Sequence, residues 1–382
     1  MYNEYLAPYK AAVDAGVGSV MSSFNIIDGI PATANKWLLT DLLRDEWSFG
    51  GLLVTDYNSI AEMASHGIAP LKEASVRALK AGTDMDMVSC GFLNTLEESL
   101  KEGKIMEDQI NTACRRVLEA KYKLGLFSNP YKYGDTLRVK EQLYTAEHRS
   151  AARAIASETF VLLKNENHLL PLGLKGKIAL VGPMADARNN MCGMWSMACT
   201  ASRHGTLLEG IRSAAGDKAE ILYAKGSNVY EDAEMEKAAA GIRPLEHEDN
   251  RKLLDEALRV ASRADVIVAA LGECAEMSGE SASRTNLEIP DAQQNLLKAL
   301  LKTGKPVVLL LFTGRPLVLN WEDANVHSIL NVWFGGSETG DAVADVLFGK
   351  VTPSGKLTTT FPRSVGQLPL FYNCLLYTSD AA

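Results

Sequence analysis

Short apolar segments alternate with helically spaced apolar positions along the first third of the chain. Residues 17–24, 50–56 and 83–88 have the lengths and flanking turn residues expected of three strands. Apolar side chains recurring every three to four positions predict helices over residues 5–16, 37–47, 71–81, 93–101 and 106–124. Strands separated by helices form parallel βα units, so this region is predicted to be an α/β structure.

The polar segment 127–143 has no sustained period and contains proline and tyrosine, which is typical of a linker between domains. A helix is predicted over residues 145–164. A second alternating series of helices and strands then begins, and its strands are expected at residues 177–182, 220–223, 266–271, 307–312 and 328–333. This series predicts a second domain, an α/β sandwich.

Composition narrows the class of protein. The chain has 382 residues, of which 47% are hydrophobic and 23% charged. This length and composition are enough to form more than one hydrophobic core. A net charge of −8 and no basic run argue against nucleic acid as a partner. The longest apolar run, residues 306–312, is far shorter than the roughly 20 residues of a membrane span, so no membrane partner is expected.

The six cysteines include no CxxC pair and no histidines at zinc-ligand spacing. They are therefore expected to be small buried thiols, with no metal, redox centre or cofactor. The residues after Met1 contain no basic and apolar signal segment.

Catalytic groups in parallel α/β structures lie beyond the carboxyl ends of strands. In the first domain this rule selects Phe24, Asp56 and Asp84 or Asp86. From its position alone Asp56 is equally compatible with a catalytic role and with capping the helix that begins near Ser59.

In the second domain the same rule selects the loop 272–284, which carries Glu273, Glu276 and Glu280. An ion pair between Glu280 and Arg284, four residues later, would be the non-catalytic alternative. Glu276 is interpreted as a solvated surface residue.

Two carboxyl groups on loops suit glycoside hydrolysis, in which an ionised group attacks the sugar and a protonated one donates to the leaving oxygen. No metal is needed for that chemistry. A serine hydrolase is not indicated because there is no GxSxG motif, and Val181-Gly182-Pro183 does not continue into a dinucleotide-binding GxGxxG motif.

Several motifs in both halves of the chain are similar to those of a known family, and they lie at residues 20–25, 28–32, 42–57, 161–165, 169–172, 278–284, 353–357 and 360–364. On these motifs the chain resembles glycoside hydrolase family three, most closely its bacterial periplasmic β-glucosidases, over about residues 5–373.

The resemblance implies an α/β fold in two parts: the C-terminal part of a (β/α)₈ TIM barrel, with about three of its eight strands, and an α/β sandwich. The expected bounds are 1–126 for the partial barrel, 127–176 for a linker and connecting helix, 177–373 for the sandwich, and 374–382 for a non-native tail.

By the same resemblance, Asp56 is the nucleophile, which decides against the capping alternative, and Glu280 is the acid/base, with Glu273 as the fallback. Met21, Phe24 and Tyr57 map onto substrate-binding positions, although core packing is an equally good explanation for these three.

The implied activity is that of a retaining, exo-acting β-glucosidase, which takes an oligosaccharide or β-glucoside. A β-xylosidase or another exo-glycosidase of the family is the alternative, and a non-catalytic carbohydrate-binding protein is a second. Compared with the family pattern, the first five barrel strands and the sugar-holding residues are expected to be missing, so the chain as given is predicted to be inactive or nearly so. A periplasmic or secreted location follows from the resemblance, and the oligomeric state stays open, a homodimer included.

Overall fold

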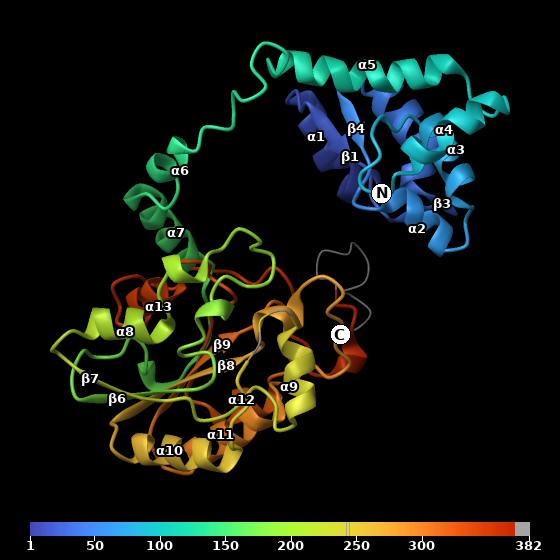
Figure 1. Ribbon diagram of the computed structural model, residues 1–382. Coiled ribbons are helices and arrows are strands. Elements are labelled where there is room, and N and C mark those ends of the chain that lie inside the picture. Colours follow the sequence, from blue (N-terminus) through green and yellow to red (C-terminus); the bar gives the residue numbers. More distant parts are fainter. Residues whose placement is uncertain (242, 244, 371–382) are drawn as a thin grey trace. The chain divides into compact units, whose positions relative to one another are not determined.

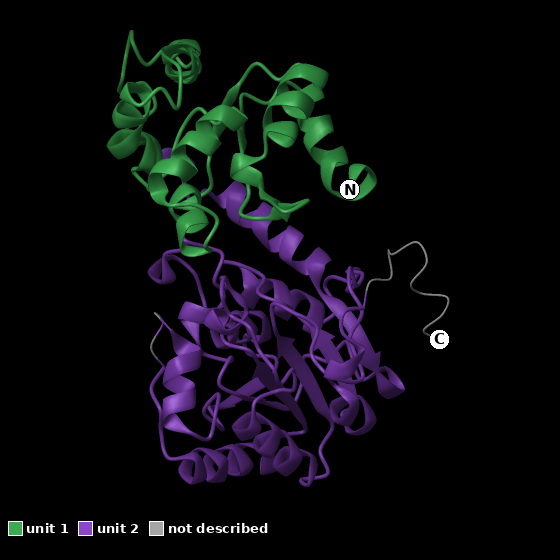
Figure 2. Ribbon diagram, turned by 90° about the vertical axis from the view of Figure 1, so that its right-hand side faces the viewer, with its two compact units in different colours: residues 1–139 green, residues 140–382 purple. Residues whose placement is uncertain are grey.

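The computed structural model describes residues 1–241, 243 and 245–370. The chain divides into two compact units, unit 1 (Met1–Val139) and unit 2 (Lys140–Ala382), which Figure 2 distinguishes by colour. Each unit is described by itself. The boundary falls inside the segment 127–143 that the sequence predicts as a linker.

The sheet of unit 1 is small. Strands β1 (Ser19–Met21) and β4 (Leu52–Val54) are parallel, and Met21 lies opposite Val54. The predicted third strand is reduced to one parallel bridge between Val54 and Met85. The order and direction of the three predicted segments are confirmed, but residues 83–88 do not form a regular strand because only one residue of the segment pairs.

Between β1 and β4 the chain forms a hairpin of β2 (Ile26–Ile27) and β3 (Ile30–Pro31). Asp28 and Gly29 turn this hairpin with positive φ angles of 51° and 77°, as a two-residue turn requires. The helices of unit 1 are η1 (Tyr2–Leu6), α1 (Ala7–Asp14), η2 (Ala32–Ala34), η3 (Trp37–Glu46), α2 (Ser59–Ser65), α3 (Leu71–Ala81), α4 (Gly91–Lys101) and α5 (Glu107–Lys123). Helix α6 (Leu137–Gln142) crosses the boundary between the units.

Unit 2 contains a six-stranded sheet in the order β5-β10-β9-β8-β6-β7. All neighbouring strands are parallel except β5, which pairs antiparallel with β10 at the edge. The strands are β5 (Val161–Asn165), β6 (Lys177–Val181), β7 (Glu220–Ala224), β8 (Val266–Gly272), β9 (Val307–Phe312) and β10 (Ser328–Asn331). The predicted positions of β6 to β10 are confirmed within a few residues.

Strand β5 corrects one prediction. The helix expected over residues 145–164 ends at Thr159, and the residues after it turn into the edge strand. The short apolar run Val161-Leu162-Leu163 fits either structure in sequence, and pairing with β10 decides for the strand.

Helices cover both faces of this sheet (Figure 1). Alternate residues of β8 point to opposite faces: Val268 and Ala270 belong to one apolar cluster, and Ile267, Ala269 and Leu271 to the other. The first cluster includes residues from α7 (Ala146–Thr159), α8 (Leu207–Ala215) and α13 (Thr339–Leu347), and the second from α10 (Asn250–Ser262), α11 (Asp291–Leu301) and α12 (Asn320–Asn325).

Helix α9 (Ala233–Ala240) packs against the short helix η7 (Ala275–Ser278). The other short helices of unit 2 are η4 (Glu166–His168), η5 (Arg188–Asn190), η6 (Ala201–Arg203) and η8 (Val365–Gln367). None of the helices in the described part of the chain combines the length and the apolarity that crossing a membrane requires.

Candidate active site

Asp56 lies in the loop that leaves the carboxyl end of β4. The loop is tied to the neighbouring segment at Met85 and Met87 by three hydrogen bonds. The Thr55 N–H donates to the Met85 carbonyl, the Asn58 N–H donates to the Met87 carbonyl, and the hydroxyl oxygen of the fully buried Thr55 accepts from the Met87 N–H, each at 2.9 Å. The backbone beside Asp56 is therefore well fixed.

The Asp56 carboxylate is partly exposed and accepts one hydrogen bond, from the N–H of Tyr57 at 2.7 Å. Helix α2 is preceded by Asn58, whose φ is 61°, and no side chain caps it. Asp56 therefore does not cap this helix, which removes the non-catalytic alternative that its position in the sequence left open. In the described residues no cation pairs with it.

A chain of buried hydroxyl groups connects the elements around Asp56. The Thr33 hydroxyl shares a hydrogen bond with Ser22 at 2.9 Å and another with Ser59 at 2.6 Å, and the Thr83 hydroxyl donates to the Thr33 carbonyl at 3.2 Å. All four residues are buried. The end of β1, the start of α2 and the segment before Met85 are thus held together.

Asp84 has a different environment from Asp56. Its buried carboxylate pairs with Arg44 at 2.6 Å and Arg116 at 2.9 Å, and it also accepts from the Leu53 N–H at 2.9 Å. Burial lowers the pKa of Arg44 below its ordinary value. Asp86 accepts from the Phe92 N–H at 3.1 Å, in the first turn of α4. Asp84 therefore joins β4, η3 and α5 rather than facing a ligand.

The three predicted substrate-binding side chains are all exposed within unit 1. Met21 is 48% exposed, Phe24 39% and Tyr57 62%. Packing in the core of unit 1 therefore does not explain why the chain has large side chains at these three positions. Met21 ends β1, Phe24 follows it, and Tyr57 follows Asp56 beyond β4, so they lie at the same edge of the sheet as Asp56.

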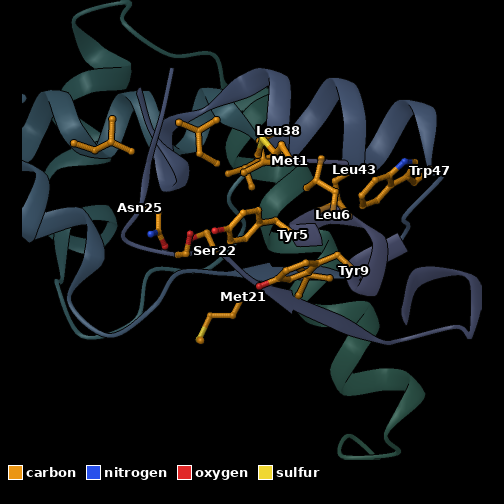
Figure 3. Close-up of a pocket in the computed structure, with 15 residues that line it drawn as sticks. Met1, Tyr5, Leu6, Tyr9, Met21, Ser22, Asn25, Leu38, Leu43 and Trp47 are labelled. Atoms are coloured by element: carbon orange, nitrogen blue, oxygen red, sulfur yellow. The ribbon is translucent and has the colours of Figure 1, made fainter. Parts of the chain in front are cut away.

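A pocket of about 490 Å³ opens beside β1 (Figure 3). Tyr5 and Tyr9 extend into it from the N-terminal helices, with Tyr5 pointing toward Ser22. Met21 lines this pocket, but Asp56, Phe24 and Tyr57 do not. It is therefore not centred on the candidate nucleophile. The lining residues are Met1, Tyr5, Leu6, Tyr9, Val20, Met21, Ser22, Ser23, Asn25, Ile26, Ile27, Leu38, Leu39, Leu43 and Trp47.

In unit 2 the loop after β8 begins with Glu273, which is 0% exposed. One of its oxygens lies 2.7 Å from an Arg284 nitrogen and 3.2 Å from Arg315, and the other accepts from the Thr313 hydroxyl at 2.8 Å and the Gly314 N–H at 3.2 Å. Removal of this carboxylate would leave the guanidinium groups of Arg284 and Arg315 without their ion-pair partner.

The same contacts correct two sequence interpretations. Arg284 pairs with Glu273 and not with Glu280, because the chain folds back across the loop. Glu276 is not a solvated surface residue, since its side chain is 10% exposed and lies 3.1 Å from Arg243.

Glu280 is the exposed carboxylate of this loop. Its N–H donates to the sulfur of Met194 at 3.3 Å. Within the residues that the structure describes, no cation or hydrogen-bond donor pairs with its carboxylate, so the side chain is available to a ligand. Asp56 and the three aromatic or apolar candidates are thus gathered in unit 1, and Glu273 and Glu280 share one loop of unit 2.

The cysteines differ from the sequence prediction. Cys192 and Cys199 form a disulfide, and Cys90 and Cys114 are exposed. Among the cysteines that the structure describes, Cys274 alone matches the expected small buried thiol, and burial raises its pKa to about 12. Cys374 and the predicted non-native tail, residues 374–382, lie outside the described residues.

The buried ring of His204 lies beside the disulfide, with its Nε2 3.7 Å from the Cys192 sulfur. The three side chains could group around a metal only with both thiols reduced, since the sulfurs are bonded to each other here.

Residues 1–120 match the family model described as Glycosyl hydrolase family 3 N terminal domain, and residues 160–381 match the Glycosyl hydrolase family 3 C-terminal domain. The chain belongs to glycosyl hydrolase family 3. The resemblance drawn from its motifs is therefore confirmed.

Two curated family 3 relatives are similar over nearly the whole chain. The periplasmic β-glucosidase of Salmonella typhimurium is 45% identical over 98% of this chain and 50% of its own length. A β-xylosidase of Formosa agariphila is 37% identical over 96% of this chain and 50% of its own length. The chain spans about half the length of these relatives.

Solved structures support the same fold. The β-glucosidase of Listeria innocua in complex with isofagomine is 38% identical, with a TM-score of 0.83 over 96% of this chain and 48% of that one. A mutant of that enzyme in complex with laminaribiose matches with the same identity and TM-score. An α/β family 3 fold is therefore established for this chain.

Proposed function

We propose that this family 3 chain is part of a retaining, exo-acting β-glucosidase that removes terminal non-reducing β-D-glucosyl residues. Asp56 attacks the anomeric carbon and forms a glycosyl-enzyme, while Glu280 protonates the leaving oxygen. Glu280 then takes a proton from water, which attacks the anomeric carbon and releases glucose with retained configuration. Two carboxyl groups suffice for both steps, so the mechanism requires no metal or cofactor.

The observation that carries the proposal is the surroundings of Asp56. Its carboxylate follows the carboxyl end of a parallel strand, is partly exposed, pairs with no cation in the described residues and does not cap α2. A carboxylate that makes one backbone hydrogen bond on a fixed loop is suited to attack. The exposed Met21, Phe24 and Tyr57 at the same sheet edge support their proposed role in binding the sugar.

For the acid/base, the contacts favour Glu280 over Glu273. Glu273 binds two arginines and two further donors in a fully buried site, where it cannot reach a leaving group. Glu280 is exposed and its carboxylate is free of such partners among the described residues. We assign Glu273 to holding the loop.

The parallel order of β1, β4 and the bridge at Met85 supports assigning residues 1–126 to the C-terminal part of a (β/α)₈ barrel. Residues 127–176 would then connect it to a sandwich over residues 177–373, followed by the proposed tail. Because family relatives are about twice as long, we expect the chain as given to have little or no activity.

The substrate proposed is a β-glucoside or oligosaccharide, because several relatives carry the name β-glucosidase. A β-xylosidase is the second candidate, favoured by the 37% identical relative of that name. The name of the Salmonella relative supports a periplasmic location.

The test uses the chain completed to the length of its relatives. Substitution of Asp56 by Ala is expected to lower turnover of aryl β-glucosides by about 10⁴-fold or more while sugar binding remains, because the covalent step is lost. Turnover that survives the substitution would refute the assignment. Bound sugar without turnover in the unsubstituted protein would favour the non-catalytic alternative, and a higher kcat/KM on aryl β-xylosides would favour the second candidate.

A further inference from the structure

A small covalently closed loop lies next to the segment that carries Glu280. It comprises residues 190–199, called here the cysteine loop, and the Cys192–Cys199 disulfide closes it. Ser196 reinforces the closure, since its hydroxyl lies 3.0 Å from the Cys192 carbonyl and 2.8 Å from that of Gly193. The Cys199 N–H donates to the Ser196 carbonyl at 3.0 Å. A cross-link of this kind reduces the conformations open to the loop.

Met194, inside the bridged part of the cysteine loop, contacts the backbone of Glu280. Its sulfur accepts from the Glu280 N–H at 3.3 Å. The sulfur also occupies the space beside Gly279, where a Cβ atom would overlap it. Glycine at this position therefore permits the close approach. A thioether is flexible and adapts to such a gap, so its position depends on what holds its backbone.

Two further contacts join the cysteine loop to the start of the same segment. The buried Asn190 side chain accepts from the Ala275 N–H at 2.8 Å. Arg243 donates to the Gly193 carbonyl at 2.7 Å and lies 3.1 Å from a Glu276 oxygen. The segment from Ala275 to Glu280 thus contacts the cysteine loop at both of its ends, and Arg243 connects Glu276 to the same loop.

Arg315 holds the segment separately. Its guanidinium donates to the carbonyls of Met277 and Ala282. Within the described residues Arg315 does not reach the Glu280 N–H, which donates to Met194. The Gly279 carbonyl of the same peptide accepts from the Ala282 N–H at 3.3 Å, which is a contact within the loop itself. Since the Glu280 carboxylate has no partner in the described residues, Met194 holds this peptide from outside the loop.

We propose that the disulfide-closed cysteine loop positions Glu280 for proton transfer, with Met194 as the positioning residue. This inference rests on the proposed acid/base role of Glu280. A proton donor must be placed closely, since a displacement of about 1 Å can lower a rate by about 100-fold. The bridge fixes Met194, and Met194 fixes the peptide from which the Glu280 side chain extends.

The first test measures amide hydrogen exchange on the chain as it is. Substitution of Met194 by Ala, or of both Cys192 and Cys199 by Ser, is expected to speed exchange of the amides of residues 279–283 by about tenfold, because one anchor of the segment is lost. Exchange in β8 should stay unchanged and shows that the unit remains folded. The conservative Met194→Leu, which keeps the packing but not the acceptor, should have a smaller effect.

The matched control is Met197→Ala, because Met197 is in the same loop and is 89% exposed. This variant should exchange like the unsubstituted chain. The proposal is overturned if Met194→Ala leaves the amides of residues 279–283 unchanged, or if Met197→Ala has the same effect.

The second test separates the positioning role from the role of Glu280 itself, in the completed enzyme. Glucosides with a poor leaving group need acid assistance, whereas a dinitrophenyl glucoside does not. Met194→Ala should therefore lower kcat/KM by about tenfold or more on glucosides with a poor leaving group, and should change it little on the dinitrophenyl glucoside. Glu280→Ala should show the same pattern more strongly, and Met197→Ala should show none.

If Glu280→Ala shows the leaving-group dependence and Met194→Ala does not, the positioning inference is wrong and the acid/base assignment stands. If Glu280→Ala lacks the dependence, the acid/base assignment is wrong, and the inference falls with it.

Discussion

Unit 1 and unit 2 each place a buried, paired carboxylate and a more exposed, unpaired one near the ends of parallel strands, so within each unit the surroundings of these two groups are opposite. Asp84 is buried between Arg44 and Arg116, as Glu273 is between Arg284 and Arg315. In the described residues, neither Asp56 nor Glu280 pairs with a cation. Asp84 and Glu273 are therefore held by ion pairs, whereas Asp56 and Glu280 have the surroundings expected of the proposed catalytic pair.

The two free carboxylates differ in what holds their loops. The loop of Asp56 is fixed by backbone hydrogen bonds to Met85 and Met87 and by the buried hydroxyl of Thr55. The loop of Glu280 contacts Met194, which lies between the two cysteines of the Cys192–Cys199 disulfide. We infer that the nucleophile is placed by its strand neighbours, whereas the acid/base depends on residues outside its own motif.

The largest expected difference in the free energy of unfolding, between a variant without the paired carboxylate and one without the unpaired carboxylate, is in unit 2. Glu273→Ala should lower the free energy of unfolding by about 3–5 kcal/mol, because two guanidinium groups would be left unpaired around a buried site. Its matched control, Glu280→Ala, removes an exposed side chain and should change stability by less than about 0.5 kcal/mol. Urea denaturation measures both. Equal effects of the two substitutions would remove the distinction between structural and free carboxylates.

In unit 1 the effects of removing the paired and the unpaired carboxylate on the free energy of unfolding should also differ, by a somewhat smaller amount. Asp84→Ala is expected to lower the free energy of unfolding by about 3 kcal/mol. This is at the lower end of the range for broken buried pairs, because Arg116 can turn toward water. Asp56→Ala should cost less than about 0.5 kcal/mol.

Hydrogen exchange at the backbone amide of Leu53 tests the Asp84 contacts locally, because this N–H donates to the Asp84 carboxylate. Hydrogen exchange of this N–H should quicken in the Asp84 variant alone. If Asp56→Ala exposes this amide to the same degree, then Asp56 too is a structural residue.

Most of the fold of unit 2 was predictable because its central strands are continuous apolar runs. Val307 to Phe312 is such a run, and it is buried along its whole length. Strand β5 was missed because Val161-Leu162-Leu163 directly continues the predicted helix, and only pairing with a strand more than 160 residues later makes it a strand.

The sequence was enough to select candidate residues for the site, but not to predict their contacts. The strand-end rule selected Asp56, Asp84, Glu273 and Glu280 alike, and it could not separate the free carboxylates from the paired ones. Spacing suggested that Arg284 pairs with Glu280, whereas it pairs with Glu273, which also binds Thr313. Likewise, nothing in the sequence connects Cys192 with Cys199 or Met194 with Glu280, because these contacts arise from loop packing.

The smallest effect concerns the hydroxyl chain of unit 1. Thr33→Val should lower the free energy of unfolding by about 1–3 kcal/mol, since the hydroxyls of Ser22 and Ser59 would lose their shared partner while staying buried. Thr136→Val, at an exposed position of the same unit, is the control and should be nearly neutral. A neutral Thr33→Val would mean that backbone hydrogen bonds alone hold the loop of Asp56.

The central claim is that Asp56 forms the covalent bond to the sugar. A β-glucoside with fluorine at C2 and a good leaving group slows the second step, so the glycosyl-enzyme accumulates in the completed enzyme. Peptide mass spectrometry should then find one fluoroglucosyl group on the peptide containing Asp56, and none after Asp56→Ala. A fluoroglucosyl group on any other residue would contradict the account.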